Sequence, residues 1–106
     1  MRKMSPVSDS VLQKVLTFIL QPIPPGGSRF RQEWEARCRA LPPETPDVLM
    51  ETLSRGTPSE QEAAIVTLRY HNYEVIETGE RTDRRYILRK AGAKEWEVIR
   101  PMLQLD

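Results

Sequence analysis

The sequence has few of the side chains that carry most catalytic and metal-binding chemistry. It contains one cysteine, Cys38, and one histidine, His71, among 106 residues. A disulfide within the chain is therefore impossible, which fits a cytoplasmic protein. Zinc sites need several Cys or His ligands at short spacing, and no such pair occurs. We therefore expect no metal, and no nucleophile motif stands beside His71 to suggest a catalytic triad.

Phosphate-binding signatures and long apolar runs are also missing. Gly26-Gly27 is not followed by the Lys-Ser/Thr of a Walker motif, and Gly-x-Gly-x-x-Gly does not occur. The apolar stretch Val11 to Leu20 is interrupted by polar residues and is shorter than the roughly 20 residues of a membrane span. We therefore expect a non-enzymatic protein with no catalytic residues, no cofactor, no small-molecule substrate and no contact with a membrane.

Cys38 and His71 both have structural interpretations. Cys38 falls on the apolar stripe of a predicted helix, where a free cysteine acts as a small hydrophobe. His71 falls at a predicted helix end, where histidine commonly interacts with the last carbonyl groups. We expect both residues to be structural.

Charge is distributed unevenly along the chain, although the net charge is only +1. Residues 1–41 carry +4, residues 42–80 carry −6 and residues 81–106 carry +3. Such a division suits electrostatic steering toward a partner or self-association. The acidic middle contains Glu60 and Glu62, which we name as a candidate acidic binding face.

Apolar spacing and capping residues predict four helices. Their predicted bounds are residues 10–20, 28–41, 46–55 and 58–71. The third and fourth helices form a helix-turn-helix-like pair around Arg55-Gly56. Each begins with Thr-Pro, and we expect Thr45 to cap the third and Thr57 to cap the fourth. Thr57 and Glu60 together predict a capping box.

The second predicted helix has an apolar face and i,i+4 charge pairs. Phe30, Trp34, Cys38 and Leu41 share that face. Glu33–Arg37 and Glu35–Arg39 are the expected ion pairs. A Pro/Gly connector precedes this helix. The first helix is therefore expected to dock either on its own domain or on another chain.

After Asn72 the apolar period changes from helical to alternating. This predicts a β-hairpin with a polar turn over residues 79–83. Residues 95–100 also alternate and favour a third antiparallel strand, although a short helix is the alternative because Trp96 and Ile99 are three residues apart. The fold class is therefore α+β, with about four helices followed by a hairpin or a three-stranded meander.

We expect one domain over residues 1–106. It comprises an N-terminal helix with its connector over residues 1–27, and a helical core with a C-terminal hairpin over residues 28–106. The order of helix, helix, helix and hairpin resembles a winged-helix domain. The resemblance is one of element order.

The hairpin carries the candidate binding patch. This basic hairpin cluster comprises Arg81, Arg84, Arg85, Arg89 and Lys90. A solvated face of a charged edge strand is its simplest interpretation. In a winged helix the same residues would contact the nucleic-acid backbone. However, the helix that would enter the major groove begins Ser59-Glu60-Gln61-Glu62, and carboxylates are repelled by phosphates. We therefore favour an accessory or regulatory protein that binds another protein or itself, with nucleic-acid regulation as the alternative.

Overall fold

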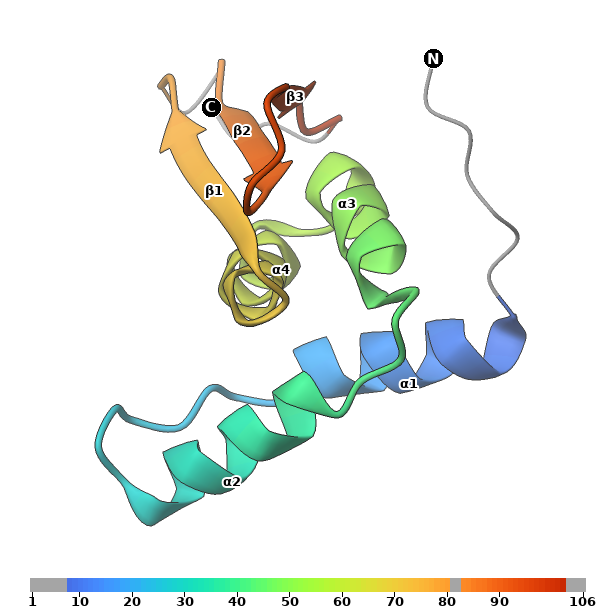
Figure 1. Ribbon diagram of the computed structural model, residues 1–106, viewed down its shortest axis with the longest axis vertical. Helices are drawn as coiled ribbons and strands as arrows, with labels where there is room; N and C mark the ends of the chain where they lie inside the picture. Colours follow the sequence, from blue (N-terminus) through green and yellow to red (C-terminus); the bar gives the residue numbers. More distant parts are fainter. Residues whose placement is uncertain (1–7, 81–82, 103–106) are drawn as a thin grey trace.

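The computed structural model describes residues 8–80 and 83–102, and within them it has four helices followed by a three-stranded antiparallel sheet (Figure 1). The helices are α1 (Asp9–Ile19), α2 (Arg29–Arg39), α3 (Thr45–Arg55) and α4 (Pro58–Tyr70). The strands are β1 (Tyr73–Thr78), β2 (Arg85–Lys90) and β3 (Glu97–Ile99). The predicted α+β architecture is confirmed, and each helix lies within two residues of its predicted bounds.

The sheet is a meander with strand order β1-β2-β3. Residues 97–99 pair antiparallel with β2, so the strand prediction for this segment is confirmed and the helix alternative is wrong. The β1–β2 turn requires glycine at position 79. Gly79 has a φ of +89°, and a Cβ atom there would lie 2.1 Å from the carbonyl oxygen of Asp83.

The α3–α4 pair forms the middle of the molecule. Figure 1 shows α1 and α2 along one side of this pair and the sheet on the other. The contacts agree, because α4 packs against α1, α2, α3 and β1, while β3 packs against α3. Helix α4 is therefore the central helix of the fold.

Helix α4 begins with the predicted capping box. The backbone N–H of Thr57 donates to Oε1 of Glu60 at 2.8 Å, and the N–H of Glu60 donates to Oγ1 of Thr57 at 3.3 Å. Pro58 occupies the first turn, where its missing N–H has no cost. After the helix, Asn72 adopts a φ of 65°, which turns the chain directly into β1.

Helix α3 begins differently from the prediction. Its N-cap residue is Glu44, which has helical backbone angles and makes no side-chain cap. Thr45 is already the first helical residue and is fully buried, so the prediction that Thr45 caps α3 is wrong. The reason is local: the N–H of Thr45 bonds the carbonyl of Pro42, so the chain turns helically before it reaches Thr45.

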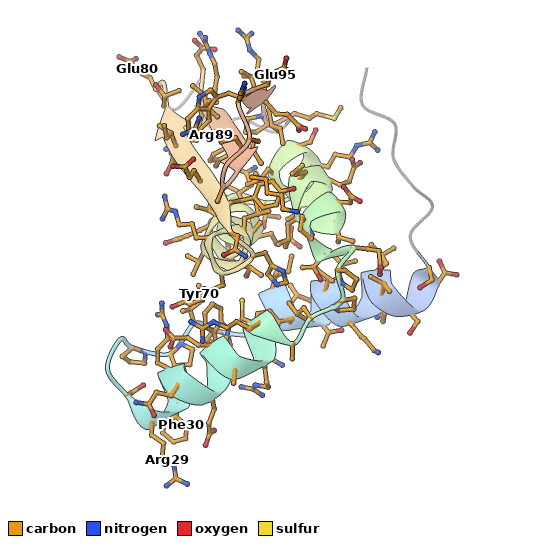
Figure 2. All side chains as sticks on the ribbon, viewed as in Figure 1. Arg29, Phe30, Tyr70, Glu80, Arg89 and Glu95 are labelled. Carbon is orange, nitrogen blue, oxygen red and sulfur yellow. The ribbon has the colours of Figure 1, made fainter. Side chains whose placement is uncertain are left out.

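The apolar face predicted for α2 is only partly buried. Trp34 and Cys38 are buried, but Phe30, which was predicted to share their face, is 69% exposed. Figure 2 shows Phe30 and Arg29 projecting from the first turn of α2. Among the other three helices, α2 packs mainly against α4. Its first turn therefore extends beyond the surface that would cover Phe30.

The core contains side chains from three layers, which are α1 with α2, the α3–α4 pair, and the sheet. Its helical members on α3 and α4 include Leu49, Leu53 and Leu68, which are fully buried, as the apolar spacing predicts. Burying one such side chain contributes about 1.5–3 kcal/mol. Trp34 stacks on Phe18 at 5.4 Å between ring centroids and meets Tyr70 edge-on at 5.6 Å. Helix α1 therefore docks on its own domain, one of the two outcomes expected from the sequence.

Within the described residues, no helix combines the length and the apolar character that crossing a membrane requires.

Candidate functional site

The strand register divides the sheet into a buried face and an open face. Val75 pairs with Leu88, and Tyr86 pairs with Ile99; Val75, Leu88 and Tyr86 are buried toward the helices. Because side chains alternate along a strand, their neighbours point to the opposite side. That opposite side is termed here the outer sheet face.

An apolar row crosses the outer sheet face. Ile76 lies directly opposite Ile87, and Ile87 lies directly opposite Val98, so one residue from each strand forms the row. Ile76 is 50% exposed and Val98 is 59% exposed, whereas Ile87 between them is half-buried. Cross-strand neighbours of this kind form a contiguous surface. The helices pack on the other side of the sheet and leave this row open to solvent.

Trp96 adds an aromatic ring beside the row, and Arg89 holds it in place. The guanidinium carbon of Arg89 lies 4.3 Å from the centre of the Trp96 ring. The same guanidinium donates to Oε2 of Glu74 at 2.5 Å and to the carbonyl oxygen of Ala93 at 3.3 Å. Figure 2 labels Arg89 within the sheet. Arg89 thus connects β1, β2 and the loop that leads to β3, and Trp96 keeps 39% of its surface exposed.

Ion pairs neutralise much of the basic hairpin cluster. Arg84 pairs with Glu77 at 2.8 Å, and Arg85 pairs with Asp83 at 2.8 Å. The hydrogen bond and charge of Arg85 hold the pKa of the Asp83 carboxyl below its usual range. With the Arg89–Glu74 pair, every arginine of the cluster that the structure describes faces a carboxylate.

The other two members of the cluster are Lys90 and Arg81. Lys90 is exposed at the end of β2, and Arg81 lies outside the described residues. Asp83 is the only acid between Arg81 and Lys90 in the sequence, whereas Glu74 and Glu77 come from β1. The antiparallel register places β1 beside β2, so aligning the two strands around the turn would have found both.

The glutamates of the candidate acidic face do not join the basic hairpin cluster. Glu60 is half-buried and occupied by the capping box, while Glu62 is exposed. Both line a hollow of about 420 Å³ with the segment Ile19–Ile23 that leaves α1. The structure therefore places the acidic and basic candidates in separate sites.

A larger groove, which the sequence does not predict, runs between α1 and the end of α2. Its volume is about 680 Å³. Its lining residues are Ser10, Gln13, Lys14, Thr17, Phe18, Gln21, Arg37, Ala40, Leu41 and Pro42. The sequence contains little that predicts this groove, because its two sides are far apart in the chain and only the residues on α1 have a regular spacing.

Cys38 is buried, as expected, whereas the ring of His71 bonds a carbonyl of a different helix from the one expected. Cys38 is fully buried, and burial raises the pKa of its thiol to about 11. Nε2 of His71 donates to the carbonyl oxygen of Cys38 at 2.8 Å. His71 thus binds a carbonyl near the end of α2 rather than one of its own helix. In the part of the chain that the structure describes, no cluster of three His, Cys, Asp or Glu side chains could hold a metal ion.

Comparisons with protein-family models, with curated proteins and with solved structures found no match for this chain.

Proposed function

We propose that this chain is a small non-enzymatic accessory or regulatory protein that binds another protein, or a second copy of itself, through the outer sheet face. The row of Ile76, Ile87 and Val98 carries this proposal. Exposed apolar side chains that form one contiguous patch with a polar surround are typical of protein interaction sites. Trp96 adds the kind of aromatic anchor that contributes most binding energy in such interfaces.

The charges around the row support a protein partner over a nucleic acid. Arg85 and Arg89 flank Ile87 on β2, and both are paired with carboxylates of this chain. A phosphate backbone would have to compete with Asp83 and Glu74 for these guanidinium groups. A largely apolar partner surface meets no such competition, since it leaves both ion pairs at the rim.

A double substitution on the outer sheet face tests the proposal. Ile76→Ser with Val98→Ser removes the two most exposed members of the row, and Phe30→Ser removes an apolar side chain from α2 that is even more exposed. Tagged versions of all three proteins are cross-linked in the native host. A partner that joins the wild type and Phe30→Ser but not the double variant supports the proposal. An unchanged set of partners in the double variant contradicts it.

Self-association is the second form of the same proposal. Size-exclusion chromatography with light scattering measures it directly. A dimer that dissociates in the double variant and persists in Phe30→Ser identifies the partner as a second copy of this chain.

The alternative is a winged-helix-like regulator that contacts the phosphate backbone through its hairpin. The order of α2, α3, α4 and the β1–β2 hairpin supports it, as do Arg84 and Arg85 beside the hairpin turn. The central position of α4 argues against it, because a recognition helix needs a free face to enter the major groove. The first two turns of α4 also carry Glu60 and Glu62.

Binding to generic duplex DNA separates the two functions. The regulator requires binding at low salt that weakens steeply as salt rises, and that is lost when Arg81, Arg84 and Arg85 are replaced together by alanine. Absence of binding at low salt excludes it. A cytoplasmic setting suits either function, because a single buried cysteine contributes no disulfide within the chain.

A further inference from the structure

The groove between α1 and the end of α2 is a second open site, separate from the outer sheet face. Figure 1 shows α1 and α2 on the side of the α3–α4 pair that faces away from the sheet. None of the residues that line the groove belongs to a strand. A ligand in this groove would therefore leave the outer sheet face free.

The wall of the groove on α1 is one continuous helix face. Its positions from residue 10 to residue 18 follow the spacing i, i+3, i+4, i+7 and i+8, and Gln21 lines the groove just beyond the end of the helix. This pattern describes a single face of an α-helix. At 1.5 Å per residue the helical part of the wall is roughly 12 Å long, which is a little over two helical turns.

The floor of the groove is apolar. Phe18 is buried and stacks on Trp34, so its ring is fixed in place. Ala40, Leu41 and Pro42 at the end of α2 complete the lining on the other side. A ligand with an apolar stripe would cover this floor.

The charged residues known to line the groove have one sign. Lys14 on α1 and Arg37 on α2 both line it, and no acidic residue from positions 8–80 or 83–102 does. Both cations are exposed. Glu33 lies one turn before Arg37, but it pairs with Arg29 at 3.7 Å rather than with Arg37. The groove therefore combines an apolar floor with two cationic sides, which complements an acidic ligand.

We propose that this groove binds an acidic amphipathic helix of a partner protein. Such a helix lays its apolar residues on Phe18 and Leu41, and its carboxylates reach Lys14 and Arg37. Helix-in-groove binding uses apolar side chains spaced three and four residues apart, which the length of the α1 wall accommodates. This site does not depend on the outer sheet face, so the two proposals fail or hold separately.

The test uses two synthetic helical peptides of about 15 residues, long enough to span the wall. Both peptides have leucine on one face of the helix. All other positions are glutamate in the first peptide and lysine in the second. Backbone amide spectra of the nitrogen-15-labelled full chain are recorded during titration. The glutamate peptide is expected to shift amides of residues 10–21 and 37–41 in a saturable manner, and the lysine peptide to bind about tenfold more weakly.

Charge reversal completes the test. The double variant Lys14→Glu with Arg37→Glu is expected to weaken binding of the glutamate peptide by about tenfold. The control variant Arg29→Glu with Lys94→Glu changes the net charge equally, away from the groove, and should keep the affinity within about twofold. Equal binding of the two peptides, shifts centred on the outer sheet face, or no saturable binding at about 1 mM peptide would each overturn the proposal.

Discussion

The hydroxyl group of Tyr86 donates a 2.8 Å hydrogen bond to Oε1 of Gln61, and both side chains are buried. Nε2 of Gln61 in turn donates to the carbonyl oxygen of Gly56 at 2.8 Å. A polar chain therefore runs from β2 through α4 to the turn that joins α3 and α4. It fixes the sheet to the helices inside an otherwise apolar layer.

Removal of the Tyr86 hydroxyl should destabilise the protein. In Tyr86→Phe the buried Oε1 of Gln61 loses this partner, and an unsatisfied buried acceptor costs about 1–3 kcal/mol. Urea unfolding measures the loss. A double-mutant cycle with Gln61→Leu isolates the pair, because the tyrosine substitution should cost less once Gln61 is absent. Equal costs in the two backgrounds would show that the hydrogen bond contributes nothing.

Arg69 protects the free edge of the sheet. Strand β1 lies at one edge, and Nη2 of Arg69 donates to the carbonyl oxygen of Val75 at 3.1 Å. Exposed strand edges template pairing with other chains. Arg69→Ala should therefore aggregate faster, with a stability loss of only about 1 kcal/mol. Static light scattering over time measures this, with Arg55→Ala as the control because Arg55 forms an exposed ion pair with Glu51. Matching aggregation rates in the two variants would refute the role of Arg69.

Cys38 should be almost inert in the folded protein. The thiolate is the reactive form, and burial raises the thiol pKa to about 11. A disulfide reagent at about pH 8, where an ordinary thiol is partly ionised, should therefore react at a rate set by unfolding. Urea should accelerate the reaction.

A surface thiol provides the control for Cys38. Ile76→Cys in a Cys38→Ala background should react at once without urea.

The raised pKa of Cys38 also affects the free energy of unfolding. Its contribution is present below the unfolded value of about 8.5 and is lost as the pH rises toward the folded value. Rapid labelling of native Cys38 would contradict its burial.

Glu35 should make the protein sensitive to acid. The Tyr70 hydroxyl donates a short hydrogen bond to Oε2 of Glu35, and Arg31 pairs with the same oxygen at 3.3 Å. The Tyr70 bond, followed by Arg31, lowers the pKa of the Glu35 carboxyl. The stability that this contributes is present above the unfolded value of about 4.3 and is lost as the pH falls through the folded value.

Glu35→Gln tests this linkage. The variant should be less stable than the wild type at neutral pH, and the difference should shrink as the pH falls below about 4.3. Urea unfolding at several pH values measures both curves. Glu33→Gln removes a more exposed carboxylate from the same helix and should have the smaller effect. A difference between wild type and Glu35→Gln that does not vary with pH would argue against the shifted carboxyl.

The sequence by itself determined the features that depend on neighbours a few residues apart. The Thr57–Glu60 capping box joins residues three apart, so its pattern is readable without a fold. The four helices and the alternating strands follow from apolar spacing, which records the face that each element buries. Even so, local preferences can compete with one another. The turn closed by the Thr45 N–H and the Pro42 carbonyl makes Glu44 the N-cap in place of Thr45.

Tertiary structure alone decided the partners of side chains that are distant in sequence. Arg39 was expected to pair with Glu35, but its guanidinium lies 5.2 Å from the Tyr70 ring centre, because α4 packs against α2. The same holds for both candidate surfaces. The apolar row on the outer sheet face exists only because the register aligns three strands, and the groove only because the fold places one face of α1 beside the end of α2. Periodicity records which face a residue occupies, whereas packing decides what that face meets.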